Sequence, residues 1–508
     1  MIESSRLKTA AAILVLLGIA MASPASGGEG FMPPLPRRER PKPRFKKFEE
    51  VQEDIVQLPA QLVNCPVCRH PIKMVLLTRP GPDGKGRVPA SDWTLTSDDY
   101  DADLCPHPVG RIRFNADIPF CPRCGFAAFQ SDFIEWLKPG RPFPPEAAVW
   151  IRETLEPVVR TVEFALVGRN TTESGEAPEQ LVERLMTVFV EQEVAPDELR
   201  CESARSVYER LGAPAWLRAK IAWFAAWSHR RALVNTPDVP YILKNVQRVQ
   251  RELGVTRTEG FALTRIDMEP EKQIEKLLAF LQPPQADPQS GDSRQPDPKS
   301  RGAEGDRVYA RLLLAGLYNR LGYQDWANHV FQAIEADLRL EYPDAMADPL
   351  WHDSNPEESD QNRRRETQVR RTAMLDFTLR SRQHLAREAE LLREAGILIR
   401  QGLDDGTYAE LPGRQIASHM YLSGEFARRT GEYARAWVWL RASAELYDPA
   451  NPEPGLEALA AAQLDGLNDY LAASGLPSPP DYARDVPLDE IRLADRLIKE
   501  EKAWRAAQ

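Results

Sequence analysis

The sequence lacks the motifs that mark the commonest catalytic sites. It has only 7 histidines in 508 residues and contains neither a His-Glu-x-x-His nor a Gly-x-Ser-x-Gly motif, so neither a zinc protease nor a serine hydrolase is indicated. The Gly-rich stretch GPDGKG lacks the spacing of a phosphate-binding loop, and no helical pattern follows it. Its Asp-Gly pair lies between strand-like segments, which predicts the turn of a β-hairpin instead.

Long apolar runs are also missing beyond the N-terminus. The stretch TAAAILVLLGIAMA is too short to span a bilayer comfortably, and it follows Arg6 and Lys8 and precedes small residues. This pattern predicts a signal peptide over residues 1–25 and therefore export to the periplasm or the cell exterior, with an uncleaved anchor as the alternative. No cysteine lies near the predicted cleavage region, so a lipoprotein anchor has no candidate residue.

The sequence also has no net positive charge. The formal net charge is −10 and the hydrophobic content is 43%, which is typical of a soluble globular protein and argues against nucleic acid as the main partner. The Pro-rich segment MPPLPRRERPKPRFKKFEE is a local exception, which we interpret as an extended linker. Contact of this arm with an anionic membrane surface is the alternative. Its basic residues are Arg37, Arg38, Arg40, Lys42, Arg44, Lys46 and Lys47.

The chain is predicted to be α+β and mostly α. Strand-like segments such as IKMVLLT and RIRFNADI lie before residue 133, and helical patterns dominate after it. Trp216, Trp223 and Trp227 share one such helix, where we expect core packing rather than a ligand groove. The polar stretch HDSNPEESDQNRRRETQ is predicted to be a loop. The predicted order is a signal peptide (1–25), a basic linker (26–56), a small zinc-ribbon-like β domain (57–133), a helical domain (134–282), a disordered linker (283–305), a tetratricopeptide-like helical domain (306–474) and a C-terminal tail helix (475–508).

Two segments, LAGLYNRLGYQDWANHVFQAI and SGEFARRTGEYARAWVWLRAS, align with each other without gaps. They resemble the tetratricopeptide helix-turn-helix unit, in which small residues let two helices approach and a glycine permits the turn between them. A generic antiparallel helical bundle is the alternative, because repeat arrays usually need about three units. The matched positions are Ala315 with Gly424, Tyr318 with Ala427, Gly322 with Gly431, Ala327 with Ala436, and Phe331 with Leu440.

Two Cys-Pro-x-Cys pairs, Cys65/Cys68 and Cys121/Cys124, are the strongest chemical signal in the sequence. Each pair can form a tight turn that directs two sulfurs to one point, so together they predict a structural zinc site with four thiolate ligands. The gap between the pairs exceeds the usual spacing of ~15–20 residues, which predicts an inserted hairpin. The alternatives are disulfide bonds, which persist in exported proteins, and thiol redox catalysis.

Other candidate ligands lie close to the two pairs. Cys105 and His107 lie between the pairs and His70 follows the first; any of them could replace or supplement a ligand, although a closed four-cysteine site needs none. Cys201 lies apart, in a helical stretch. The acidic DDYDAD is similar to the start of a calcium loop, but Leu104 stands where that loop needs Gly.

The order CPVC, DADLCP and FCPRCGFAAFQSDF, followed by tetratricopeptide-like helices, resembles the bacterial family catalogued as domain of unknown function 2225. The resemblance covers residues 57–133 well and the helical part loosely. In that family, paired CPxC motifs flank an Asp-x-Asp element, which Asp101 and Asp103 match here. A glycine commonly follows each pair; Gly125 matches the second, whereas Arg69 replaces the first. The family brings no established reaction.

These patterns predict a non-enzymatic exported protein that binds another protein or a peptide, since helical repeats typically offer a concave binding surface. The zinc ion is expected to be structural, and no catalytic residue is predicted. The alternative is a metal- or thiol-dependent enzyme of the cell envelope. A catalytic zinc would need a position open for water, and the mixed ligand set available to this alternative is Cys65, Cys68, Cys121 and His107.

Overall fold

The computed structural model shows a mostly helical protein with a small amount of β-structure. The predicted signal peptide, the basic arm and most of the predicted disordered linker lie outside the described residues. Within the described part of the chain, no helix is both long enough and apolar enough to cross a membrane. The structure describes residues 56–57, 61–74, 77–80, 87–89, 101–105, 118–157, 197–232, 245–246, 248–250, 270–281, 298–339, 360–410, 415–448, 456–473 and 483–507.

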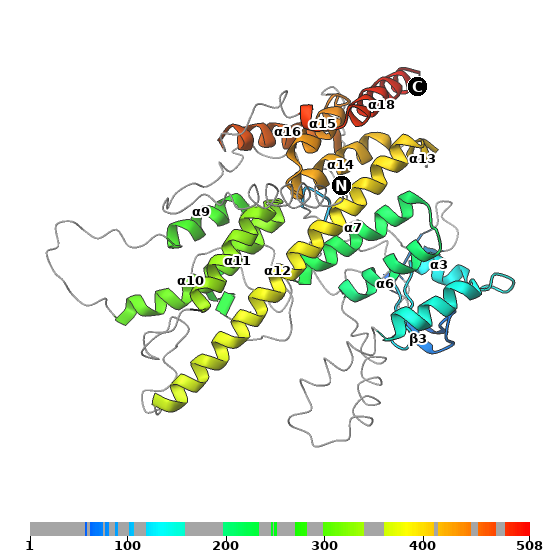
Figure 1. Cartoon of the computed structure of the whole chain (residues 1–508). Coiled ribbons are helices and arrows are strands. Elements are labelled where there is room, and N and C mark those ends of the chain that lie inside the picture. The colour runs from blue at the N-terminus through cyan, green and yellow to red at the C-terminus, as the bar shows by residue number, and fades with distance from the viewer. Residues whose placement is uncertain are drawn as a thin grey trace, which may run out of the picture.

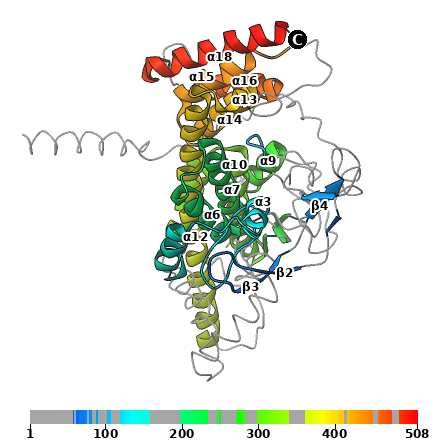
Figure 2. The same ribbon diagram turned by 90° about the vertical axis from the view of Figure 1, so that its right-hand side faces the viewer.

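The helices are arranged around one long central helix. They are α3 (Gln130–Glu135), α6 (Asp197–Arg210), α7 (Ala215–Ala232), α9 (Pro270–Leu281), α10 (Pro298–Leu321), α11 (Gln324–Leu338), α12 (Asp360–Asp404), α13 (Thr407–Glu410), α14 (Ile416–Arg429), α15 (Tyr433–Ala444), α16 (Leu456–Ala473) and α18 (Leu488–Ala507). α12, of 45 residues, has α9, α10 and α11 along one side and α6, α7 and the cysteine region along the other (Figure 1). Figure 2 shows α13, α14, α15, α16 and α18 gathered at one end of α12.

Two small antiparallel sheets lie near the cysteine pairs. The strands are β1 (Val56–Gln57), β2 (Gln61–Asn64), β3 (Pro71–Met74), β4 (Leu77–Pro80) and β5 (Arg87–Pro89). β2 pairs with β3, and β4 pairs with both β1 and β5. Pro80 lies opposite Arg87 across GPDGKG, which confirms the predicted hairpin. The stretch IKMVLLT, predicted as one strand, is divided between β3 and β4 in different sheets, and RIRFNADI lies outside the described residues apart from Ile118.

Two helices begin inside segments that the sequence predicts to be irregular. α12 begins at Asp360, within the polar stretch predicted to be a loop, so that prediction is wrong for the second half of the stretch. Its Arg, Gln and Glu residues are good helix formers, and Arg371 donates a hydrogen bond of 3.0 Å to the Leu338 carbonyl at the end of α11. α10 begins at Pro298, within the predicted disordered linker, because proline suits the first turn of a helix.

The pairs α10–α11 and α14–α15 form two helical hairpins with the same turn. Gly322 and Gly431 have φ angles of 83° and 76°, a conformation that glycine adopts without steric cost. In each turn, the residue after the glycine donates a backbone hydrogen bond of 2.8 Å to the carbonyl five residues earlier. Gly424 lets α14 approach α15, because a Cβ atom there would lie 2.8 Å from the Leu440 Cγ atom. The two aligned glycines, Gly322 and Gly431, therefore occupy equivalent turns in two helical hairpins.

Two hydrophobic cores share α12. The first joins the cysteine region to α6, α7, the C-terminal half of α12 and the helices that follow it, so it crosses the predicted boundary at residue 133. The second joins α9, α10 and α11 to the N-terminal half of α12. Trp227 is fully buried in the first core and stacks on Phe224, while Trp216 and Trp223 are partly buried against it. The predicted core packing of this tryptophan-rich helix is confirmed.

Candidate metal centre and the buried Asp-x-Asp loop

The first cysteine pair lies on a tight turn between β2 and β3. The Cys65 N–H donates a hydrogen bond of 2.8 Å to the His70 carbonyl, and the Arg69 N–H donates one of 3.0 Å to the Cys65 carbonyl. Next to the turn, Asn64 pairs with Pro71 in the sheet. Cys65 and Cys68 therefore extend from one short loop whose backbone is held by hydrogen bonds.

The second pair lies on a turn of the same construction. The Cys121 N–H donates a hydrogen bond of 2.8 Å to the Phe126 carbonyl, and the Gly125 N–H donates one of 2.9 Å to the Cys121 carbonyl. An antiparallel bridge pairs Phe120 with Ala127, in the position of the strand pairing beside the first turn. The two turns are thus equivalent residue by residue.

The residue that follows each pair has a left-handed backbone. The φ angle is 76° at Gly125 and 64° at Arg69. Glycine adopts this conformation freely, whereas another residue does so at a cost of roughly 1–2 kcal/mol. Arg69 is exposed, so its side chain needs no space inside the protein. Arginine at this position therefore leaves the first turn intact at a modest energetic cost.

The four sulfur atoms converge on one point. Their Sγ atoms all lie within 4.8 Å of one another, and the six cysteines of the chain form no disulfide. The two shortest contacts join one turn to the other: Cys65 to Cys124 at 3.7 Å, and Cys68 to Cys121 at 3.5 Å. Cys68 is partly exposed and the other three are fully buried. This arrangement can hold a metal ion.

Contacts between the thiols make the four groups titrate together. Hydrogen bonds from Cys121 and Cys124 lower the pKa values of Cys65 and Cys68. Hydrogen bonds to Cys124, Cys65 and Cys68 raise the pKa of Cys121. Each thiolate that forms adds negative charge, which makes loss of a proton from the remaining thiols less favourable. A cation at the centre would favour loss of those protons too, since metal ligands bind as thiolates.

Aromatic packing fixes the second turn against the helical body. The ring of Phe126 lies 5.4 Å from that of Phe133 in α3 and 5.1 Å from that of Phe143, measured between centroids. The hydroxyl of Tyr208, on α6, accepts a hydrogen bond of 2.9 Å from the Phe129 N–H. The candidate metal centre is therefore part of the first core and not a separate module.

The other predicted ligands do not join the cluster in the described part of the chain. His70 supplies its carbonyl to the first turn, and its imidazole is not among the converging groups. Cys105 and Cys201 are fully buried elsewhere in the core, and burial raises the pKa of the Cys105 thiol well above its ordinary value. His107 lies outside the described residues.

Residues 101–105, DADLC, form a tight loop that is buried between helices. The Asp101 N–H donates a hydrogen bond of 2.9 Å to the Cys105 carbonyl, and the Leu104 N–H donates one of 2.9 Å to the Asp101 carbonyl. The Asp101 side chain is almost completely buried, and that of Asp103 is completely buried. The acidic pair therefore faces the protein interior, where its charges need partners.

Side chains from α7 and α14 hold this loop. The indole N–H of Trp223 donates to the Asp103 carbonyl, and that of Trp227 donates to the Asp103 Oδ2 atom, both at 3.1 Å. The hydroxyl of Tyr421, on α14, donates to the Ala102 carbonyl. The tryptophans predicted as core residues thus also fix the Asp-x-Asp element.

Arg230, at the end of α7, lies at the centre of the charge network. Its guanidinium contacts Asp101 at 2.9 Å and Asp103 at 2.7 Å. It also contacts Glu388 of α12 at 2.6 Å. Arg320, at the end of α10, donates to Asp101 at 2.9 Å. The Arg230 guanidinium therefore connects the loop to α7 and α12. Through Arg320, the loop also contacts α10.

The second hairpin completes the network. Arg429 contacts Asp103 at 3.3 Å and Glu425 at 2.9 Å, and Arg428 contacts Glu425 at 2.7 Å. Arg428 also donates to the Leu321 carbonyl at the end of α10, so the network joins the two hairpins. Although burial opposes its charge, Arg230 and Arg429 hold the pKa of Asp103 below its ordinary value. The side chains are those of Asp101, Asp103, Glu388, Glu425, Arg230, Arg320, Arg428 and Arg429.

No family model, curated protein or solved structure matches this chain. The resemblance to domain of unknown function 2225 remains a prediction from the sequence. The function is therefore inferred from the chemistry and geometry of the two sites described above.

Proposed function

We propose that this protein is a non-enzymatic binding protein, with a structural zinc site and tetratricopeptide-like helical hairpins that bind a protein or peptide. The observation that carries the proposal is the convergence of four thiols from two equivalent turns. The predicted signal peptide would export the protein, and the basic arm could then lie at a membrane surface. Both segments lie outside the described residues.

The spacing of the sulfurs fits zinc. Zn–S bonds are about 2.3 Å long, so the sulfurs of a regular tetrahedron lie about 3.8 Å apart. The shortest contacts in the cluster are 3.5 and 3.7 Å. Four thiolates around one ion are typical of structural zinc, since a catalytic zinc keeps one position for water. The two turns, each next to a short antiparallel pairing, support a zinc-ribbon-like arrangement.

The helical hairpins support a binding role. The two hairpins share a glycine turn, and in the second hairpin Gly424 lets the two helices approach closely; both features are typical of a tetratricopeptide unit. Stacked units of this kind offer extended surfaces for peptides and proteins. The long helix α12 lies between the two hairpins in the sequence and packs against both. The protein would then present its partner with a surface formed by more than one hairpin.

Metal content tests the zinc site. We expect about one zinc per chain in the purified full-length protein, and less than about one tenth of that in Cys124→Ser. Cys201→Ser is the matched control, because Cys201 is a fully buried thiol outside the cluster. A Cys124→Ser protein that kept its zinc would instead favour the mixed site with His107 and an enzyme.

Peptide display tests the binding role. A random peptide library is selected on the zinc-loaded full chain, and synthetic copies of enriched sequences are titrated against it. We expect a shared sequence pattern and saturable one-to-one binding. Selection that enriches no common sequence would contradict the proposed function.

A further inference from the structure

A hollow lined with tyrosines lies where the turns of both hairpins meet α16. α16 packs against α14 and α15, and Tyr323 reaches the same place from the turn between α10 and α11. We call this place the tyrosine hollow. The residues that matter for its chemistry are Tyr323, Arg428, Tyr433, Asp465, Asp469 and Tyr470.

The aromatic rings form a continuous wall. The Tyr470 ring lies 5.8 Å from the Tyr323 ring and 5.3 Å from the Tyr433 ring, measured between centroids. Tyr433 and Tyr470 are partly exposed, whereas Tyr323 is buried. The Arg428 guanidinium already lies over the Tyr323 ring, 5.7 Å from its centroid. The wall therefore offers π faces of the kind that bind cations.

The rim of the hollow is acidic. Asp465 and Asp469 are exposed and lie one helical turn apart on α16, where both line the hollow. Burial, Tyr470 and the nearby Asp325 raise the pKa of Tyr433, so its hydroxyl stays neutral at ordinary pH. Carboxylates beside neutral phenol rings disfavour an anion and attract a cation.

Arg428 also lines the hollow, but its positive charge does not cancel this acidity. Two hydrogen bonds of 2.7 Å join Arg428 to both carboxylate oxygens of Glu425, and a third joins it to the Leu321 carbonyl. Arg428 is almost completely buried and belongs to the charge network. Its charge is thus balanced inside the protein, and the exposed carboxylate of Asp469 keeps negative charge at the rim of the hollow.

We propose that the tyrosine hollow binds the positively charged side chain of an arginine or lysine in an extended segment of the partner. The aromatic wall contacts the flat or aliphatic part of that side chain, and the exposed carboxylate of Asp469 pairs with its charge. This inference rests on the proposed binding function and specifies the chemistry of the ligand. Because the turns of both hairpins line the hollow, it requires both hairpins to be in place.

Charge-matched peptides test the proposal. The probes are fluorescein-labelled Gly-Ser peptides with three arginines, three lysines or three citrullines, titrated by anisotropy against the zinc-loaded full chain. Citrulline has the shape of arginine without its charge. We expect the arginine probe to bind at least tenfold more tightly than the citrulline probe, with affinity that falls as salt is added. Equal affinities for these two probes, or no binding of either, would overturn the proposal.

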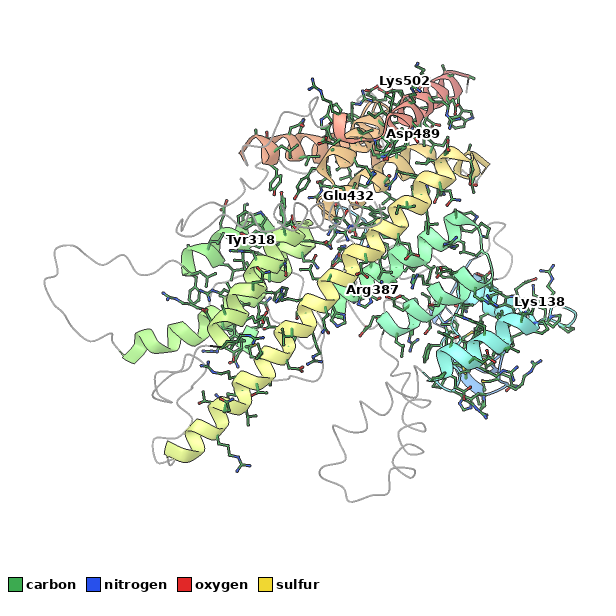
Figure 3. All side chains as sticks on the ribbon, in the orientation of Figure 1. Lys138, Tyr318, Arg387, Glu432, Asp489 and Lys502 are labelled. Atoms are coloured by element: carbon green, nitrogen blue, oxygen red, sulfur yellow. The ribbon has the colours of Figure 1, made fainter. Side chains whose placement is uncertain are left out.

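Variants locate the site. Asp465→Asn/Asp469→Asn should weaken binding of the arginine probe at least tenfold, and Tyr470→Leu should weaken it several-fold. The matched control is Asp489→Asn/Glu500→Gln, which removes the same charge from α18; Asp489 is labelled in Figure 3. Zinc content and helical circular dichroism should not change. Undiminished affinity of the double aspartate variant would sink the proposal. If display-selected peptides then bind that variant as well as wild type, the proposed function stands without this site; if no peptide binds wild type, both fail.

Discussion

The cysteine cluster and the Asp-x-Asp network both place ionisable side chains in the first core, but they differ in how charge is balanced. In the network, arginines from three helices and carboxylates from the loop and two helices neutralise one another within hydrogen-bonding distance. In the cluster, four thiols face one another within 4.8 Å, so their full deprotonation concentrates negative charge. The charges of the network balance one another, whereas the cluster, once deprotonated, would need a cation to balance its negative charge.

Metal removal should give the largest effect and should separate the two regions. Structural zinc contributes roughly 10–16 kcal/mol to the folding of small zinc peptides, so chelation should unfold both cysteine turns. We expect the Cys65 and Cys121 amides to lose protection from hydrogen exchange, while amides of α12 keep theirs. Exchange followed by mass spectrometry, before and after excess chelator, measures this difference. Added zinc should restore protection; equal loss along α12 would show that the two regions unfold together.

Removal of the central guanidinium should give the next largest effect. Arg230→Met leaves Asp101, Asp103 and Glu388 buried without their main counter-charge, so we expect a loss of about 3–5 kcal/mol in the free energy of unfolding. Urea denaturation measures the loss. Arg218→Met on the same helix is the control and should change stability little. A loss below about 1 kcal/mol in Arg230→Met would show that the network contributes little.

Replacement of a helix glycine by alanine should have opposite effects on stability in the two hairpins. A Cβ atom at Gly424 would lie 2.8 Å from the Leu440 Cγ and backbone N atoms, so Gly424→Ala should cost about 1–3 kcal/mol. Gly316, in α10, has no such neighbour within 4 Å, so Gly316→Ala should stabilise by about 0.5–1 kcal/mol through helix propensity. Denaturant midpoints of both variants check the difference. An unchanged or raised midpoint in Gly424→Ala would contradict the close packing inferred at Gly424, and a lowered midpoint in Gly316→Ala would contradict the open space at Gly316.

The parts of this structure that the sequence predicts are those determined by neighbouring residues. A Cys-Pro-x-Cys turn and a glycine turn depend on local backbone geometry, so both cysteine turns and both hairpin turns lie where the pattern places them. The charge network could not be predicted, because its partners are far apart in the chain: Arg320 is 219 positions from Asp101. The Asp-x-Asp element could be noticed, but nothing local indicates that Arg230 and Glu388 neutralise it.

A pH-dependent effect concerns a histidine pair that joins α7 to α12. The Nδ1 atoms of His229 and His384 lie 2.9 Å apart, a distance that requires one proton between them. The His229 Nε2 atom also lies 3.3 Å from the Glu202 carboxylate of α6. Burial, His229 and Arg380 lower the pKa of His384 to about 4. Arg387, labelled on α12 in Figure 3, pairs with Glu202 and adds positive charge beside the pair.

This lowered pKa predicts acid destabilisation, because the folded protein holds His384 neutral while the unfolded chain protonates it near pH 6.5. The stability from neutral His384 is present above that pH and is lost as the pH falls towards about 4. Partial exposure to solvent reduces the effect, so we expect a loss of roughly 1–2 kcal/mol. Urea midpoints measured across this range should fall less steeply in His384→Gln than in wild type. His329→Gln, at an exposed position, is the control and should keep the wild-type slope. An unchanged slope in His384→Gln would show that His384 does not titrate as inferred.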